Sequence, residues 1–289
     1  MQTAGFASLT FDIITNRTLT TAGVLQEVGD AETVVFVGGI SPRLEGEEMK
    51  VNEEGFKGGD RTSIELPRVQ RELIASLKKA GKKVVYVNCS GSAIALAPEA
   101  ENADAIVQAW YGGEKGGEAV ADVLFGAYTP SGKLPVTFYR STDQLPAYED
   151  YCMKGRTYRY FEGEALFPFG YGLSYTTFEL GSPTWNAKKG TLSVSVANTG
   201  DCEGAQTVMV FVKDPNDTDG PIKSLRDFAR VELKAGEKKD VSFNLSEKTF
   251  ELWNSDTNTM HAKDQTYTVM VGTSSADPNM RTIDVKNGK

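Results

Sequence analysis

The sequence predicts two domains, first an α/β sandwich in which helices flank a parallel sheet, and then an all-β sandwich. The chain has 289 residues, and a domain usually holds about 100 to 200 residues. Apolar runs and helical patterns alternate over residues 34–139, which is typical of parallel strands joined by right-handed crossovers. From about Thr177 onward only strand patterns occur. We therefore expect an α/β domain at 1–140, an aromatic connector at 141–176 and a β domain at 177–289.

The strands of the first domain are expected where short apolar runs end at glycine or at a polar turn. One such run stops at Gly38 and Gly39, and its β-branched, uniformly apolar character is typical of a strand buried on both faces. The expected strands are 7–15, 34–37, 84–88, 104–111 and 132–139. Pro135 favours an edge position for the last of them. Because no core partner precedes the first strand, the chain looks as if it begins within a domain.

Helices are expected between these strands, at 20–31, 67–79 and 115–126. Pro67 suits the first turn of a helix because its missing N–H would have no partner there. Apolar residues at three- and four-residue spacing predict the faces that pack on the sheet. These residues are Leu25 and Val28 in the first helix, Val69, Leu73, Leu77 and Ala80 in the second, and Val120, Val123 and Leu124 in the third.

The connector is rich in Tyr, Phe, Gly and Pro and has no helical period. It carries too much apolar surface for a flexible linker, so we expect it to be ordered. Its aromatic residues are expected to form its core, namely Tyr158, Tyr160, Phe161, Phe167, Phe169 and Tyr171.

The β domain shows alternating strands at 191–200, 206–214, 228–245 and 265–274. Turn residues recur about every 8 to 12 positions, which is typical of a β-sandwich. No Cys-Trp-Cys pattern occurs, so a fibronectin-type sandwich fits better than an immunoglobulin one. We expect this domain to pack and stabilise rather than to carry a site.

Composition and charge argue against several classes of function. The net charge of −8 and the pI near 5.0 disfavour nucleic acid and anionic membranes as partners. No apolar run reaches the roughly 18 residues of a membrane span, and no signal peptide is evident. The single histidine, His261, makes zinc hydrolysis and a Ser-His mechanism poor choices. The glycines of 112–117 lack phosphate-binding spacing, so we expect neither a nucleotide cofactor nor a metal.

A polar loop crowded with carboxylates follows the strand at 34–37. Its acidic residues are Glu45, Glu47, Glu48, Glu53 and Glu54. Ligands of open α/β sheets sit beyond the carboxyl ends of the strands, which is where this loop would lie. The loop is therefore a candidate for carboxylate chemistry, and the alternative is a solvated acidic loop without a function of its own.

Four separated blocks of the sequence resemble glycoside hydrolase family 3 enzymes of the β-xylosidase and β-glucosidase kind. They are GGISPRLEGEE at 38–48, GGDRTSIELPRVQ at 58–70, AWYGGEKGGEAVADVLFGAYTPSGKLPVTF at 109–138 and GRTYRYFEGEALFPFGYGLSYTTFE at 155–179. The resemblance runs from about residue 30 to the end. It implies the C-terminal part of such an enzyme, an α/β sandwich followed by a fibronectin type III-like domain.

The resemblance also implies a division of catalytic groups. In that family a (β/α)8 barrel supplies the aspartate nucleophile, and the α/β sandwich supplies an acid/base glutamate. No stretch of this sequence matches the block that carries the nucleophile. The barrel is therefore expected to be missing, and the chain alone is expected to be inactive.

One glutamate of the acidic loop should then be the acid/base residue. Xylosidase-type relatives carry a Gly-Ile turn and then Glu-x-Glu, which Gly39-Ile40 and the later Glu-Gly-Glu match with Glu45 first. Glucosidase-type relatives carry Glu-Gly shortly before Asp-Arg, which Glu54 approaches with one residue too many. We place the role on Glu45, with Glu54 and then Glu47 as alternatives. A second carboxylate nearby favours the protonated form that a general acid needs.

Two pairs of residues are candidates for contact with substrate. Trp110 and Tyr111 stand at the carboxyl end of a predicted strand and could stack on a sugar ring, or else pack at a domain boundary. Asp60 and Arg61 could form hydrogen bonds that fix the loop, or else contact sugar hydroxyls.

The sequence thus predicts part of a retaining, exo-acting β-glycosidase, most similar to β-xylosidases. The resemblance implies terminal β-linked sugars as substrates, in xylo-oligosaccharides or aryl β-glycosides, and a periplasmic or secreted enzyme. The alternative is a catalytically inactive, stand-alone binding or structural module. Whether the chain continues upstream into a barrel would separate the two.

Overall fold

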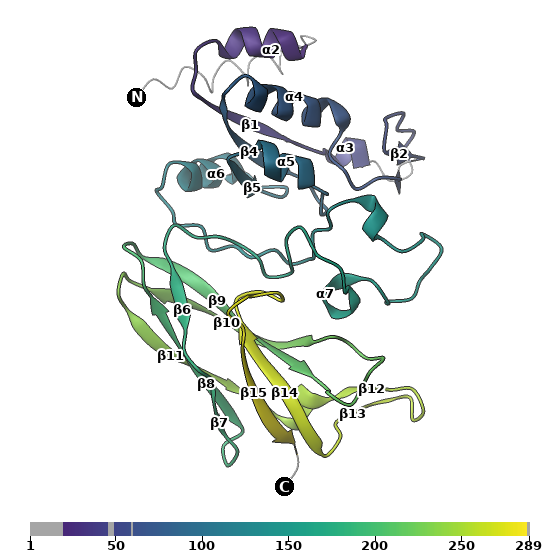
Figure 1. Ribbon diagram of the computed structural model, residues 1–289, viewed down its shortest axis with the longest axis vertical. Helices are drawn as coiled ribbons and strands as arrows, with labels where there is room; N and C mark the ends of the chain where they lie inside the picture. Colours follow the sequence, from purple (N-terminus) through teal and green to yellow (C-terminus); the bar gives the residue numbers. More distant parts are fainter. Residues whose placement is uncertain (1–19, 46–48, 59, 288–289) are drawn as a thin grey trace. The chain divides into compact units, whose positions relative to one another are not determined.

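The computed structural model describes residues 20–45, 49–58 and 60–287. The chain divides into two units, Met1–Gly117 with Arg140–Thr142, and Glu118–Tyr139 with Asp143–Lys289 (Figure 1). The predicted strand at 7–15 and the predicted alternative Glu47 lie outside the described residues.

The first unit is built on a parallel three-stranded sheet, as predicted. Its strands are β1 (Thr33–Gly39), β4 (Lys83–Cys89) and β5 (Ala105–Gln108), in the order β1-β4-β5. The central strand β4 is the most buried, since it has a neighbour on each side. All three carboxyl ends lie at one edge, so the loops that follow them meet there.

Helices alternate with these strands along the sequence, three of them at the predicted places. They are α2 (Thr21–Val28), α4 (Arg68–Lys79), α5 (Ala97–Asn102) and α6 (Gly116–Leu124), the last of which crosses the boundary between the units. Figure 1 shows α2 and α4 side by side over one face of the sheet, where α4 packs on β1 and β4. The α5 helix was not predicted.

The predicted packing face of one helix, α4, was wrong in part. In α4 the buried residues are Ile74 and Leu77, while Val69 is 66% exposed and Ala80 is exposed too. The helix is rotated relative to the predicted face. Gln70, rather than an apolar residue, faces the end of β1 and forms hydrogen bonds with Gly39. In α2, Val24 is buried, and the predicted Leu25 and Val28 beside it are partly buried.

The predicted strand at 132–139 was also wrong. This segment belongs to the second unit, where it runs beside the connector. Leu134 N–H donates to the carbonyl of Tyr171, and Phe138 N–H donates to that of Phe167. Pro135 has no N–H, so the segment cannot form a continuous ladder. The predicted strand at 104–111 is shorter than expected and ends at Gln108.

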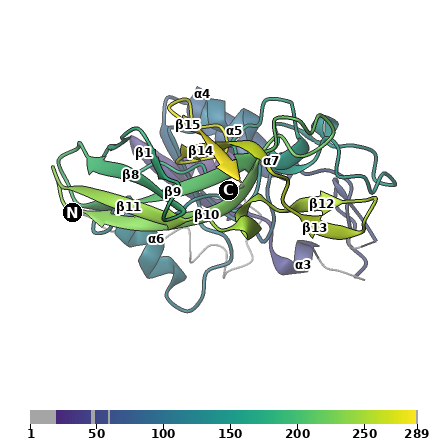
Figure 2. The same ribbon diagram turned by 90° about the horizontal axis from the view of Figure 1, so that it is seen from below.

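The second unit contains the predicted antiparallel sandwich. One sheet has the order β10-β9-β14-β15 and the other β11-β8-β6, with β7 also paired to β8. The strands are β6 (Phe178–Leu180), β7 (Thr184–Asn186), β8 (Thr191–Asn198), β9 (Gly204–Lys213), β10 (Ser224–Leu233), β11 (Lys238–Asn244), β14 (Gln265–Gly272) and β15 (Arg281–Asn287). A further hairpin, β12 (Leu252–Asn254) with β13 (Thr259–His261), extends away from these sheets (Figure 2).

Apolar residues at alternate positions fill the space between the two sheets. Leu192, Val194 and Val196 of β8 face Val208 and Val210 of β9 within one buried cluster.

The other helical segments are short, namely α7 (Thr157–Tyr160) and the 3₁₀ turns η1 (Thr142–Gln144) and η2 (Glu247–Phe250).

Most of the aromatic residues predicted to form the core of the connector make ring contacts, although all six are only partly buried. Tyr158 stacks on Phe169 with ring centroids 4.5 Å apart, and both contact Phe211 of β9. Phe167 stacks on Tyr171 at 5.1 Å. This order explains why so aromatic a segment is not a flexible linker.

Candidate functional site

Glu45 lies just beyond the carboxyl end of β1. The strand ends at Gly39, and the four-residue helix α3 (Pro42–Glu45) follows at once. Ser41 begins this turn, because its hydroxyl accepts a hydrogen bond from Leu44 N–H at 3.2 Å. The turn ends with the Glu45 side chain at the edge of the sheet where the parallel strands terminate.

The direction in which the chain leaves β1 is fixed by Gln70 of α4. Its side-chain amide accepts from Gly39 N–H and donates to the Gly39 carbonyl, each at 2.7 Å. Gly39 has a φ of 121°, and a Cβ there would lie 2.0 Å from the Cys89 carbonyl oxygen. Only glycine fits this position. These two residues therefore position the turn that carries Glu45.

Both carboxylate oxygens of Glu45 have a hydroxyl partner. Ser92 donates to Oε1 at 2.9 Å, and the Tyr111 hydroxyl lies 2.8 Å from Oε2. The same hydroxyl lies 2.8 Å from the carbonyl oxygen of Ile40. The Tyr111 ring lies over Gly91, where a Cβ would approach it to 2.7 Å. The segments after β1, β4 and β5 thus each contribute one residue to a single cluster, namely Glu45, Ser92 and Tyr111.

Arg61 brings a positive charge to this cluster. It belongs to a short hairpin of β2 (Phe56–Lys57) and β3 (Asp60–Arg61). Its guanidinium donates to the carbonyls of Ser63 and Glu65 and, at 3.4 Å, to the Ser92 hydroxyl. Burial lowers the pKa of Arg61, while the charges of Glu45 and Glu65 act in the opposite direction.

Glu65 ties the segment after β3 to Thr142. Its carboxylate accepts from the Thr142 N–H at 2.8 Å and hydroxyl at 2.6 Å, and also from the Ser63 hydroxyl. Burial opposes ionisation of Glu65, but these hydrogen bonds outweigh it and lower its pKa to about 2. Glu65 is therefore an ionised structural anchor beside the cluster.

A buried polar network stands behind Ser92. Asn88 donates to Gln108 Oε1 at 2.6 Å, and the Gln108 amide donates to the Ser90 hydroxyl at 3.1 Å. Ser90 in turn donates to the Ser92 carbonyl at 2.8 Å. Sequence reasoning missed these residues. The sequence feature that could have revealed them is a polar residue near the end of each of two apolar strands, since Asn88 pairs with Gln108 at the last paired position of β4 and β5.

The other predicted site residues lie apart from this cluster or at its border. Glu54 is 71% exposed and pairs with Arg68 at 3.1 Å on the surface. Asp60 is exposed in the β2–β3 hairpin. Trp110 is partly buried and has a φ of 57°, a left-handed value that is unusual for a side chain of this size. The structure therefore joins Glu45, Arg61 and Tyr111 and leaves Glu54 outside.

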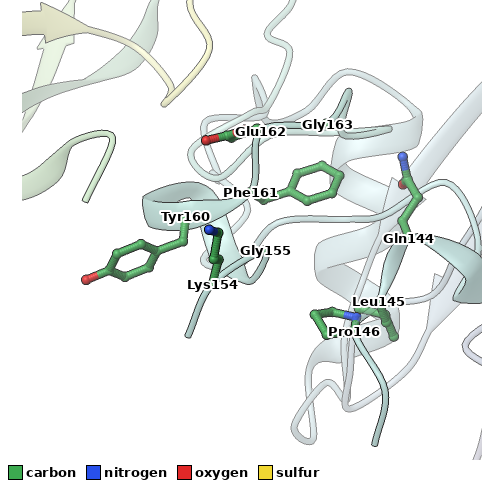
Figure 3. A pocket seen from close by; sticks show the side chains of 9 residues that line it. All are labelled: Gln144, Leu145, Pro146, Lys154, Gly155, Tyr160, Phe161, Glu162 and Gly163. Atoms are coloured by element: carbon green, nitrogen blue, oxygen red, sulfur yellow. The ribbon is translucent and has the colours of Figure 1, made fainter. Parts of the chain in front are cut away.

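The described residues form shallow crevices in each of the two units. One of about 360 Å³ adjoins the cluster and is lined by Gly38, Gly39, Ile40, Ser41, Pro42, Gln70, Cys89 and Tyr111. Another, of about 420 Å³, lies in the second unit and is lined by residues of 144–163. In Figure 3 the ring of Phe161 points into it, whereas the side chain of Tyr160 points away. None of the predicted site residues lines this second crevice.

Among the described residues no group of three or more His, Cys, Asp or Glu side chains is arranged to hold a metal ion. Within the same residues no helix is both long and apolar enough to cross a membrane.

Comparison with protein families matches residues 8–175 to the glycosyl hydrolase family 3 C-terminal domain. The chain belongs to glycoside hydrolase family 3. Residues 206–275 match the fibronectin type III-like domain. The fold of this family 3 chain is therefore an α/β domain with a parallel sheet, followed by a fibronectin type III-like β domain, as the sequence predicted.

Relatives of this family 3 chain include both xylosidases and glucosidases. It is 53% identical over 283 residues to a xylan 1,4-β-xylosidase of Xylanibacter ruminicola, a match that covers 96% of this chain and 33% of the relative. It is 40% identical over 271 residues to a periplasmic β-glucosidase of Salmonella typhimurium, which covers 87% of this chain and 34% of that protein. The chain thus spans about a third of the length of these relatives.

Solved structures show the same fold. The chain superposes on a β-glucosidase from Kluyveromyces marxianus with a TM-score of 0.81 and 32% identity, covering 94% of this chain and 34% of that one. The TM-score with a β-glucosidase from Listeria innocua is 0.76 at 30% identity, covering 94% and 39%.

Proposed function

We propose that this chain supplies the acid/base glutamate, Glu45, of a retaining, exo-acting β-glycosidase. The observation that carries the proposal is the cluster at the carboxyl edge of the sheet. There Ser92 and Tyr111 hold both oxygens of Glu45, beside the charge of Arg61. Glu54, by contrast, forms a solvent-exposed ion pair, which is typical of a surface residue.

The proposed chemistry needs a second carboxyl group. Retaining glycosidases use two carboxyl groups about 5 to 5.5 Å apart, one as nucleophile and one as acid and later base. We propose that a barrel domain outside these 289 residues supplies the nucleophile, as the family resemblance implies. Glu45 would protonate the leaving-group oxygen and then take a proton from the water that hydrolyses the glycosyl-enzyme.

The proposed substrates are terminal β-linked sugars of xylo-oligosaccharides or aryl β-glycosides. The xylosidase name of the relative that is 53% identical supports this class. Tyr111 and Arg61 are the proposed sugar contacts that adjoin Glu45, and Trp110 and Asp60 remain candidates. The periplasmic glucosidase relative supports a periplasmic or secreted location. We also propose the division into domains at 1–140 and 177–289, joined by the connector.

A leaving-group series tests the proposal. The chain would be joined to the N-terminal two thirds of the Xylanibacter relative and assayed on aryl β-xylosides. Glu45→Ala should slow substrates with poor leaving groups by about 10²- to 10⁴-fold and activated ones far less, because only the former need the proton. Azide should rescue the activated substrates, since it attacks the glycosyl-enzyme without a general base. Glu54→Ala is the matched control.

Other outcomes have clear meanings. If Glu54→Ala gives this pattern and Glu45→Ala does not, the acid/base role belongs to Glu54 and not to Glu45. An equal loss for all leaving groups in Glu45→Ala would indicate a role in folding or loop position. A joined protein without any activity would favour the binding or structural module.

A further inference from the structure

The hydroxyl of Tyr111 has two hydrogen-bond acceptors and only one proton. It lies 2.8 Å from the carbonyl oxygen of Ile40 and 2.8 Å from Oε2 of Glu45. Burial and the contact with Glu45 raise the pKa of Tyr111 to about 12, so the phenol keeps its proton at neutral pH. A carbonyl oxygen can only accept. When Glu45 is ionised, the single Tyr111 proton can point at the Ile40 carbonyl or at Glu45 Oε2, and the other pair of oxygens then has no proton between them.

A proton on Glu45 removes this mismatch. Oε2–H of Glu45 then donates to the Tyr111 oxygen, and Tyr111 donates to the Ile40 carbonyl. Ile40 is only 3% exposed, and among the described residues no other hydrogen bond to its carbonyl occurs. A buried carbonyl without a donor is costly, so this arrangement is favoured over one in which Tyr111 turns away from Ile40.

The other oxygen of Glu45 has the opposite character. Arg61 donates to the Ser92 hydroxyl at 3.4 Å, so the hydroxyl proton of Ser92 is directed to Oε1 at 2.9 Å. Oε1 is therefore an acceptor, and Oε2 is the oxygen with room for a proton. Among the described residues, the charged and titratable groups that interact with this carboxyl are Arg61 and Tyr111, and Glu65 acts on Arg61 in turn.

We propose that Tyr111 is a positioning residue that holds the proton of Glu45 on Oε2 while this carboxyl is in its acid form. The inference rests on the proposed acid/base role of Glu45. During catalysis the leaving-group oxygen would replace Tyr111 as acceptor. The proton passes from Oε2 to that oxygen, Glu45 becomes a carboxylate, and Tyr111 keeps its own proton.

The backbone supports this role for Tyr111. The left-handed φ of 57° at Trp110 turns the chain directly after β5, and such a value is normally avoided by large side chains. Gly91 leaves space for the Tyr111 ring above the end of β4. Tyr111 itself is 42% exposed, so part of the residue is open to solvent at this edge of the sheet.

The test reads the protonation of Glu45 directly in the 289-residue chain. The chain is labelled with ¹³C at glutamate carboxyl carbons, and the Glu45 signal is identified by its loss in Glu45→Gln. Its chemical shift is followed against pH in the unmodified chain, Tyr111→Phe and Ser92→Ala. Tyr175→Phe is the matched control, because its hydroxyl bonds only the Val123 carbonyl among the described residues of the second unit.

Opposite signs are expected for the two variants at the site. Tyr111→Phe removes two hydrogen bonds from the acid form but one from the carboxylate, so the titration midpoint should fall by roughly half to one pH unit. Ser92→Ala removes a donor to the carboxylate, so the midpoint should rise. Tyr175→Phe should leave it unchanged.

A rise or no change in Tyr111→Phe overturns the proposal, since Tyr111 would then serve the carboxylate as Ser92 does. A second measurement needs no substitution. With tyrosine labelled at ¹³Cζ, the Tyr111 signal should inflect at the same pH as the Glu45 signal, and its absence would also overturn the proposal. Neither readout depends on hydrolysis, so failure here is separate from failure of the leaving-group series.

Discussion

Removing the charge of Glu65 should destabilise the first unit in a pH-dependent way. The Glu65 carboxylate accepts three hydrogen bonds from Ser63 and Thr142, and its pKa is lowered from 4.5 to about 2. In a fully buried site this difference corresponds to roughly 3 kcal/mol. Glu65 is only partly buried, so solvent screening reduces the expected contribution to about 1–2 kcal/mol at pH 7.

The sign follows from the direction of the pKa change. Because the folded pKa lies below the unfolded one, the stabilisation is complete above pH about 4.5 and disappears as the pH falls toward 2. Glu65→Gln should therefore cost about 1–2 kcal/mol at pH 7 and progressively less between pH 4.5 and 2. Urea unfolding of the whole chain, followed by amide hydrogen exchange in β1 and β4, reports on the first unit.

Glu72→Gln is the matched control, because Glu72 pairs with Arg68 on the exposed face of α4. It should change the unfolding free energy by less than about 0.5 kcal/mol at any pH. The reasoning is refuted if the cost of Glu65→Gln is the same at pH 7 and pH 2.5. It is also refuted if Glu65→Gln and Glu72→Gln behave alike.

Three further predictions concern activity and packing. The 289-residue chain alone should hydrolyse p-nitrophenyl β-xyloside and β-glucoside no faster than background, because loss of a catalytic group lowers the rate by on the order of 10³-fold or more. Turnover by the pure chain would contradict this. Gly91→Ala should lower the free energy of unfolding by about 1–3 kcal/mol, because the added Cβ would lie 2.7 Å from the Tyr111 ring. Gly113→Ala is the control and should be neutral, because a Cβ there meets no atom within 4 Å. Leu77→Ala, at a site only 1% exposed, should cost about 2–5 kcal/mol in urea unfolding, and Val69→Ala less than about 0.5.

Much of the fold could be predicted because burial imposes a period on the sequence. The apolar run of β4 and the alternation in β8 both follow from the faces they bury. The errors have two causes, a polar group in a core-facing position and a strand pattern whose partner lies elsewhere in the chain. Gln70 faces the sheet from α4 and turns Val69 outward, which an apolar stripe cannot reveal. The segment at 132–139 has a strand pattern, but its partner is the connector rather than the parallel sheet.

The candidate site was predictable in position but not in its partners. Glu45 was placed by family resemblance, and the sheet order β1-β4-β5 puts the loops after these strands side by side. Ser92 and Tyr111 each come three residues after a strand, β4 ending at Cys89 and β5 at Gln108. Their bonds to Glu45 span 47 and 66 residues of sequence, so no local pattern encodes them.

The proton arrangement at Glu45 depends on all three strand ends together. In the proposed arrangement, the segment after β1 contributes Glu45 and, through Ile40, the carbonyl that orients Tyr111, while the loop after β4 contributes Ser92. Because each oxygen of Glu45 meets a hydroxyl from a different strand end, the two oxygens become inequivalent. A general acid must hold its proton within hydrogen-bond reach of the group that it protonates, and such an inequivalence would favour one oxygen for this task. In the proposed acid form of Glu45, the order of the parallel strands therefore decides which oxygen would carry the proton.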